Sequence, residues 1–174
     1  MGLLSAFGRR GYRSLKNGEM FGRLPYRETL RARGFDVDRP LYHGTASDFA
    51  EFDLAHGGRN FGGRDSRMAV SLTSEPWNAS DYATGVTADG LGANVRPVFA
   101  KGRFKPVRES DLMRLAGEET TLTEQYARAM EQARNEGYDG IALHGVARGL
   151  PTVEYKVFPD ESGRFGNIVP MFGR

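Results

Sequence analysis

The apolar residues of this chain fall in short runs separated by glycine, proline and polar residues, and this spacing constrains the fold more than any other feature. Short apolar runs bounded by turn residues predict strands, at residues 40–42, 69–73, 95–100, 141–143, 152–158 and 167–172. Proline, capping and glycine signals predict helices, at residues 25–33, 75–82, 109–116 and 121–136. Short strands with a few interspersed helices are typical of the α+β class, and 174 residues suffice for one such domain.

The helix that begins at Thr121 has the clearest local signals. Thr121 and Glu124 form a capping box, in which each side chain can accept a hydrogen bond from a backbone N–H of the first turn. Apolar residues then recur at spacings of four, four and three and mark one buried stripe, Leu122, Tyr126, Met130 and Ala133. Gly137 ends the helix, because glycine readily adopts the left-handed conformation that follows a last turn.

Charge divides the chain into a basic arm and a nearly balanced remainder. Residues 1–40 hold nine basic and four acidic side chains, a net charge of +5, whereas the rest of the chain carries a net charge of −3. We therefore expect an arm with a short helix at residues 1–39 and a folded domain at residues 40–174. An arginine-rich arm can bind nucleic acid, an acidic protein surface or anionic lipid, or it can be a solvated leader.

The residue types exclude several kinds of site. The chain has no cysteine, which removes disulfides, thiolate zinc sites and cysteine nucleophiles. The three histidines lack the spacing of a metal site, and the Gly-x-Ser-x-Gly motif of serine hydrolases is missing. No apolar run reaches the length of a membrane span, and the first residues do not form a secretory signal. We expect a protein of the cytoplasm, or one carried in a particle.

Three residues stand out, and each allows two interpretations. His43 lies where a short strand meets Gly44, either as a ligand-binding ring or as a structural turn residue. Glu154 shares one face of its predicted strand with Lys156, and that face either meets solvent or projects Glu154 into a cleft as a catalytic carboxylate. Tyr82 lies on a predicted helix, where its ring either packs in the core or forms a platform for a flat ligand.

The order of these motifs resembles one family. The motifs are Tyr42-His43-Gly44-Thr45, Val70-Ser71-Leu72-Thr73 with a helix ending near Tyr82, Gly137-Tyr138-Asp139-Gly140-Ile141, and Val153-Glu154-Tyr155-Lys156-Val157-Phe158-Pro159. Over about residues 40–172 this order resembles ADP-ribosyltransferases of the diphtheria-toxin and poly(ADP-ribose) polymerase branch, especially the small versions of phages and mobile elements. The resemblance implies two small packed antiparallel sheets, with flanking helices, that form a cleft for NAD.

The resemblance also implies a role for each motif residue. Glu154 would be the catalytic glutamate, and His43 would hydrogen-bond the adenine-side ribose. The Gly44 backbone would hold the nicotinamide carboxamide, with Thr45 beside it in the same NAD-binding motif. Tyr82 would stack on the nicotinamide ring. NAD would be the substrate, and this chemistry requires no metal.

Ser71 departs from the family pattern. The second motif usually has a tyrosine where Ser71 stands, so one wall of the nicotinamide site is either absent or supplied by Trp77 or Phe61. By its place in the motif, Ser71 is still a candidate for NAD binding. The arginine-using toxin branch has a serine in this strand, but it has arginine where His43 stands and Glu or Gln where Thr152 stands. The histidine branch therefore matches better.

The implied function is NAD-dependent mono-ADP-ribosylation of a macromolecule, a protein first of all, with release of nicotinamide. One alternative is an inactive domain of this kind that serves as a binding or phage-particle module, tethered through its basic arm to nucleic acid or a particle component. Another is an NAD glycohydrolase, in which water is the acceptor. Loops at residues 56–67 and 84–94 are expected to select the acceptor.

Overall fold

A computed structural model of the chain describes residues 23–47, 49, 51–56, 63–85, 92–116 and 121–172. Its helices are α2 (Arg23–Ala32), α3 (Pro76–Gly85), α4 (Glu109–Ala116) and α5 (Leu122–Asn135), with the short 3-10 helices η1 (Leu54–His56) and η2 (Asp65–Arg67). Its strands are β1 (Leu41–Thr45), β2 (Val70–Thr73), β3 (Asn94–Ala100), β4 (Phe104–Arg108), β5 (Gly140–Ala147), β6 (Leu150–Val157) and β7 (Ile168–Pro170). The predicted α+β class is confirmed.

The seven strands form one mixed sheet in the order β4-β5-β6-β2-β1-β3-β7. The pair β4–β5 is parallel, and the other neighbours are antiparallel. The described register joins β1 to β2 through one residue pair only, Tyr42 opposite Thr73. The two packed antiparallel sheets that the resemblance implies are therefore not found: the described strands form a single mixed sheet, whose two halves, β4-β5-β6-β2 and β1-β3-β7, meet at this pair.

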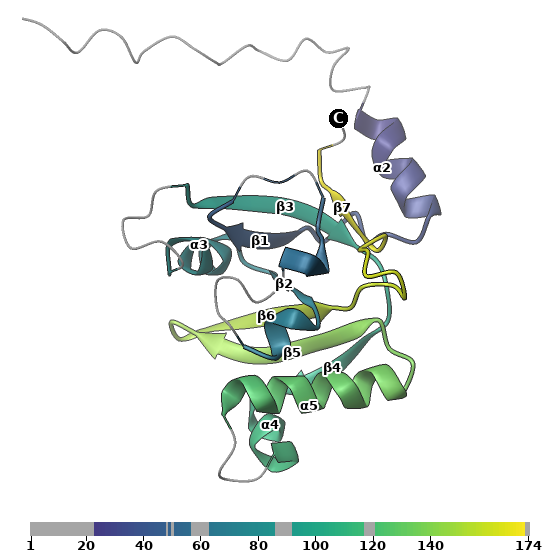
Figure 1. Ribbon diagram of the computed structural model, residues 1–174. Helices are drawn as coiled ribbons and strands as arrows, with labels where there is room; N and C mark the ends of the chain where they lie inside the picture. Colours follow the sequence, from purple (N-terminus) through teal and green to yellow (C-terminus); the bar gives the residue numbers. More distant parts are fainter. Residues whose placement is uncertain are drawn as a thin grey trace, which may run out of the picture.

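The helices lie on one face of the sheet and loops cover the other. Helix α3 packs on Gly44 of β1, α2 packs on Phe99 of β3, and α4 and α5 pack on Ile141 of β5. Figure 1 shows α3 beside β1 and α5 running along β5. On the opposite face, the loop residues Phe52 and Phe165 pack against the apolar side chains of β1, β2 and β3. Between the strands that α3 and α5 cover lie β2 and β6, and side chains of both helices reach β6, Tyr82 to Glu154 and Tyr126 to Lys156.

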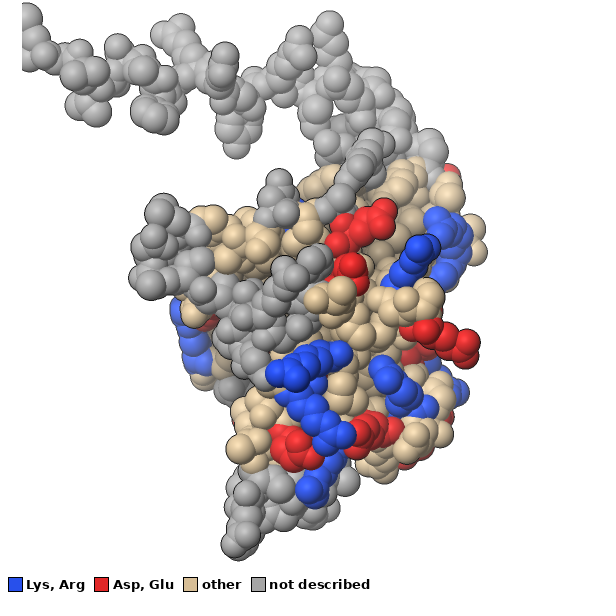
Figure 2. Space-filling model, in the orientation of Figure 1, with Lys and Arg blue, Asp and Glu red and all other residues tan. Residues whose placement is uncertain are grey.

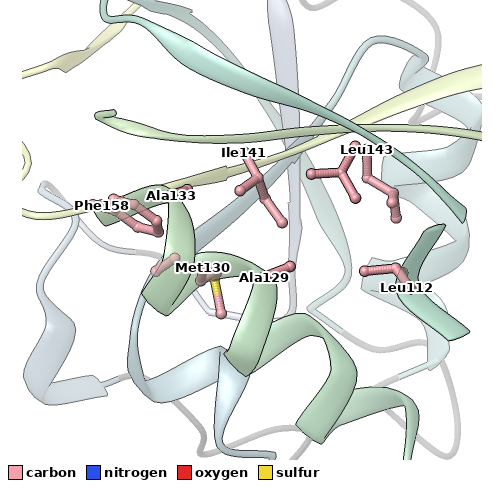
Figure 3. Close-up of a cluster of buried hydrophobic side chains, with 9 residues drawn as sticks. Leu112, Ala129, Met130, Ala133, Ile141, Leu143 and Phe158 are labelled. Carbon is pink, nitrogen blue, oxygen red and sulfur yellow. The ribbon is translucent and has the colours of Figure 1, made fainter. Parts of the chain in front are cut away.

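A cluster of buried apolar side chains anchors α4 and α5 to the sheet (Figure 3). Its members are Ala69, Val107, Leu112, Ala129, Met130, Ala133, Ile141, Leu143 and Phe158. Leu112, Met130 and Ile141 are fully buried, and burying a side chain of this size contributes about 1.5–3 kcal/mol. This cluster fixes β5 and its partner β6 firmly against the helices, and with them the side chains that β6 presents.

Four of the predicted details need correction. His43 lies inside β1, which runs on to Thr45, and not at a strand-to-turn junction. Strand β4 is missing from the prediction, because its sequence FKPVR has little apolar character and it is held by parallel pairing with β5. Leu122 is 53% exposed, so the buried stripe of α5 begins at Tyr126. Pro97, which lacks an N–H and so predicts an edge or irregular strand, lies in the inner strand β3, where its carbonyl accepts from the backbone N–H of Met171 and the register with β7 begins at Val98.

The segment before β1 is part of the folded structure from α2 onward. Leu30, Phe35 and Val37 are each no more than 3% exposed, and they pack with Phe99 of β3. Gly34 follows α2 with a φ of +86°, the left-handed conformation that ends a helix. The sequence divides the chain at residues 39 and 40, whereas the packing of α2 ties residues 26–37 to the sheet. Most of the basic arm lies outside the described residues.

The N-cap of α5 yields a prediction of moderate size. The Thr121 hydroxyl accepts a hydrogen bond from the backbone N–H of Glu124 at 3.3 Å, as the capping box predicts. Thr121→Ala should lower the free energy of unfolding by about 1 kcal/mol, because that N–H loses its partner. Denaturant unfolding measures the loss. Thr84→Ala is the matched control, an exposed helical threonine that caps no helix start, and it should change stability by less than about 0.5 kcal/mol. Equal losses for both variants would contradict the capping role.

Candidate active site

Glu154 lies on the helical face of the sheet, in contact with Tyr82 of α3 and with Lys156 of its own strand. It is opposite Thr73 of β2 on one side and Leu143 of β5 on the other, so its strand is central in the sheet. Its side chain is 12% exposed. Oε2 of Glu154 accepts a hydrogen bond from the Tyr82 hydroxyl at 3.2 Å, and Oε1 lies 2.8 Å from the ammonium of Lys156. Glu154 therefore lies on a central strand and is largely shielded from solvent, while the cleft beside it stays a prediction.

Tyr82 reaches Glu154 because α3 packs very closely on β1. A Cβ atom built on Gly44 would lie 1.9 Å from the carbonyl oxygen of Ala79, so only glycine fits at this contact. The hydroxyl of Tyr82 is next to Glu154, while the residue as a whole keeps 38% of its surface exposed. Part of Tyr82 is therefore accessible to solvent, and its role as a platform for a flat ligand stays a prediction. The role of the Gly44 backbone toward a carboxamide stays a prediction.

Lys156 is the residue of this site that sequence reasoning missed. Its side chain is 7% exposed, and its Nζ lies 2.9 Å from Ser71 Oγ and 3.4 Å from Asp65 Oδ2 in addition to its contact with Glu154. The alternation of β6 places Lys156 on the face of Glu154, but only the register with β2 brings Ser71 opposite it. Asp65 belongs to η2, and nothing in its local sequence marks it.

Two tyrosine hydroxyls stay protonated beside this cluster. Burial, and next the negative charge of Glu154, raise the pKa of both Tyr82 and Tyr126 above the ordinary tyrosine value. A protonated phenol can donate a hydrogen bond to a carboxylate. The ring of Tyr126, on α5, lies with its centroid 5.1 Å from the Lys156 ammonium. Glu154 and Asp65 together with Lys156 carry a net charge of −1, so the site favours a cation.

His43 is held in one tautomer. Its Nδ1 lies 2.9 Å from the carbonyl oxygen of Ser71, and because a carbonyl can only accept, Nδ1 carries the proton. Burial lowers the pKa of His43, the bond to Ser71 opposes this, and the charge of Arg96 lowers it further. The ring is therefore neutral near pH 7 and its Nε2 is a hydrogen-bond acceptor. Phe49 and Phe52 contact the ring edge to face, at centroid distances of 5.9 and 5.1 Å.

His43 and Glu154 lie on opposite faces of the sheet and are linked through Ser71. Tyr42 faces the same side as Thr73 and Glu154, so the next residue, His43, faces the other side. The carbonyl of Ser71 accepts from His43, and its hydroxyl accepts from Lys156. The structure therefore brings Tyr82 and Glu154 into direct contact, and it connects His43 to them at the junction of the two half-sheets.

The other motif residues that the structure describes make contacts within the protein, and the proposed role of Thr45 toward NAD stays a prediction. Thr45 is buried, and its hydroxyl accepts a hydrogen bond from the backbone N–H of Ser47. Trp77 lies under the guanidinium of Arg148, whose Cζ is 5.6 Å from the ring centroid. Asp139 accepts from the backbone N–H of Arg103 and so fixes the turn before β5. Phe61 lies outside the described residues, as do parts of both expected acceptor loops.

The described pocket does not coincide with this cluster. A pocket of about 160 Å³ is lined by residues that include Leu41, Phe104 and Tyr155. Tyr155 alternates with Glu154 along β6, so the pocket lies on the opposite face of the sheet. The contacts of Glu154, and not this pocket, define the candidate site.

Among the described residues, no group of three or more His, Cys, Asp or Glu side chains is arranged to hold a metal ion. None of the described helices combines the length and apolar character that crossing a membrane requires. Over α5, basic and acidic side chains lie next to one another (Figure 2), as in the pairs of Arg64 with Glu124 and Glu131.

Comparisons with protein-family models, with curated proteins and with solved structures found no match for this chain.

His43 gives a prediction on the pH dependence of stability. Its pKa is lowered in the folded state from the ordinary 6.5, mainly by burial, so the unfolded chain binds a proton that the folded chain does not. The free energy of unfolding should therefore fall as the pH drops below about 6.5, by up to about 1.4 kcal/mol per pH unit. Thermal unfolding between pH 5 and 8 measures this, and His43→Gln should flatten the dependence. The exposed His144, changed to Gln, is the control and should leave it as in the wild type.

Proposed function

We propose that the chain is an NAD-dependent ADP-ribosyltransferase that attaches a single ADP-ribose to a macromolecular target, with a protein as the first candidate. The observation that carries the proposal is the contact between the Glu154 carboxylate and the Tyr82 hydroxyl, 3.2 Å apart, on a central strand and a helix far apart in sequence. The resemblance assigns these two residues to the catalytic carboxylate and the nicotinamide platform, which must lie together in such an enzyme.

The charge of the site supports the same chemistry. In the proposed reaction the bond between C1′ of the ribose and the nicotinamide nitrogen breaks, and its electron pair goes to that nitrogen, which turns the pyridinium into neutral nicotinamide. Positive charge develops on the ribose, as in glycoside cleavage. A carboxylate beside the ribose stabilises this charge, and the net −1 of Glu154, Asp65 and Lys156 has the required sign. A nucleophile of the target then bonds to C1′ and releases its proton.

The neutral His43 supports a place for the second ribose of NAD. Its Nε2 is an acceptor, because Nδ1 donates to the Ser71 carbonyl. A ribose hydroxyl can donate to such a nitrogen. Since β1 and β2 share one residue pair, a dinucleotide that crosses their junction could reach His43 on one side and Glu154 on the other. In this proposal Gly44, Thr45 and Ser71 stay candidates for NAD binding, and NAD is consumed as a substrate.

The proposal is tested with NAD labelled in its adenylate half. The purified protein is incubated with labelled NAD and a bacterial cell extract, free nicotinamide is measured, and proteins are analysed by mass spectrometry for an ADP-ribose adduct. We expect both products. Free ADP-ribose without labelled protein would indicate a glycohydrolase instead, and no consumption of NAD would contradict the proposal.

A second candidate is a domain that binds without transferring ADP-ribose. The observation that favours it is the ion pair between Lys156 and Glu154, which gives the carboxylate a cation within the protein itself. Titration calorimetry with NAD separates the two candidates. Binding of NAD without release of nicotinamide would support a binding module. In either case the proposed setting is the cytoplasm of a bacterial host or a phage particle, with the basic arm as a tether to protein or nucleic acid.

A further inference from the structure

Lys156 is a buried cation whose contacts converge on the candidate catalytic carboxylate. Its ammonium touches Oε1 of Glu154 at 2.8 Å and the hydroxyl of Ser71 at 2.9 Å. An ammonium has three N–H donors, and the Asp65 carboxylate, 3.4 Å away, takes the third direction. Each donor of this buried cation therefore has an acceptor, and these come from three separate elements, β6, β2 and η2.

The two oxygens of Glu154 have different surroundings. Oε1 faces the ammonium of Lys156, and Oε2 faces the hydroxyl of Tyr82. Because Lys156 and Tyr82 hold one oxygen each, the plane of the carboxylate is fixed. Oε2 lies on the side of the exposed Tyr82 ring, where a ligand can approach. A preorganised carboxylate of this kind needs no rearrangement when charge develops beside it.

Lys156 also separates two carboxylates. Glu154 Oε1 and Asp65 Oδ2 both lie within 3.4 Å of one nitrogen atom, so without that cation the two acids would repel each other strongly. When two carboxylates share a site without a cation, one of them keeps its proton to a higher pH. A protonated Glu154 would not stabilise a developing cation.

We propose that Lys156 is a positioning residue: its ammonium fixes Oε1 of Glu154, leaves Oε2 toward the ligand side, and keeps Glu154 ionised beside Asp65. This role rests on the proposed function. It differs from the roles given to the motif residues, because Lys156 acts on the reaction only through Glu154.

The other titratable groups that face this cluster belong to α3, α4, α5 and β1. Tyr82 of α3 and Tyr126 of α5 have a pKa raised by burial, so they stay neutral in the range where carboxylates titrate. Glu109, at the start of α4, acts on Tyr126 through its negative charge. His43 of β1 is on the opposite face and meets the cluster only through Ser71. Lys156 is the cation that contacts both carboxylates of the cluster.

The test compares the pH dependence of kcat/KM for NAD in the wild type, in Lys156→Met and in Asp65→Asn. In Lys156→Met, the acid limb of the kcat/KM profile should shift to higher pH by about 1–3 units, because Glu154 and Asp65 then face each other without a cation. In Asp65→Asn, the acid limb should shift to lower pH, because Glu154 keeps its contact with the cation and no longer faces the negative charge of Asp65. A residue with only a structural role would lower activity at every pH and leave the limb in place.

The control is Lys105→Met, which also removes a lysine from an ion pair, that with Glu136, but two strands away from β6. It should leave the acid limb unchanged. If Lys156→Met does not fold, the test rests on Asp65→Asn. An acid limb at the same pH in Asp65→Asn and in the wild type would then overturn the role of Lys156. If the wild type is active and the acid limb stays at the same pH in both variants, the role of Lys156 is contradicted while the proposed function still stands. A wild type that consumes no NAD at any pH overturns the proposed function, and this role with it.

Discussion

Glu154→Gln is expected to lower the rate of ADP-ribosyl transfer about 100- to 1,000-fold. Glutamine has nearly the shape of glutamate, so the contact with Tyr82 can be kept while the negative charge is lost. The cluster would change from a net charge of −1 to neutral, and the developing charge on the ribose would lose its stabiliser. Release of nicotinamide from NAD, measured under single-turnover conditions, reports the chemical step directly.

The comparison with other variants makes this prediction specific. Glu161→Gln is the matched control, because Glu161 is exposed in the turn after β6, and it should leave the rate unchanged. Calorimetry should show that Glu154→Gln still binds NAD, since the substitution removes stabilisation of the transition state more than of the ground state. Nicotinamide release at the wild-type rate from a folded Glu154→Gln protein would remove Glu154 from its proposed role.

Gly44→Ala is expected to have the largest effect on the fold around the site. The added methyl group would lie 1.9 Å from the Ala79 carbonyl oxygen and 2.9 Å from the Ala83 backbone nitrogen. Both belong to the backbone of α3, so the whole helix must move, at a cost of about 1–3 kcal/mol or more. Because α3 carries Tyr82, the same movement should separate its hydroxyl from Glu154. Denaturant unfolding measures the loss of stability.

Gly85→Ala is the control for this prediction. Gly85 is the last residue of the same helix, and a Cβ atom there would have no neighbour within 4 Å. Alanine in place of glycine in a helix should leave stability unchanged or raise it by up to about 1 kcal/mol. If Gly44→Ala and Gly85→Ala lose similar amounts of unfolding free energy, the close packing of α3 on β1 is not the reason for glycine at position 44.

The fold was predictable where local sequence decides it. The helix at residues 109–116 was predicted with the observed bounds, and the capping box at Thr121 marked the start of α5, because these signals act within one turn. Strand β4 was missed because its formation depends on pairing with β5, which follows it only after two helices. The join of the two half-sheets at Tyr42 and Thr73 could not be predicted either, since no local pattern encodes how far two strands stay paired.

The site was predictable for the residues that belong to motifs. Glu154 and Tyr82 were chosen from the order of the motifs, and the structure brings them into contact. Lys156 was visible as a neighbour of Glu154 on the strand, but its partners lie 85 and 91 residues away in sequence, at Ser71 and Asp65. The face on which His43 lies was also not predictable, because it depends on the register between strands.

The pairing of β2 with β6 has a consequence for the order in which the protein is made. Because synthesis runs from the N-terminus, β2, Asp65 and Tyr82 are made long before Glu154 and Lys156 are added. The cluster can close only after a loop of 85 residues is closed, which is a slow step compared with the formation of a local helix. A nascent chain therefore carries no assembled cluster, and the proposed activity would begin only once β6 has been inserted between β5 and β2.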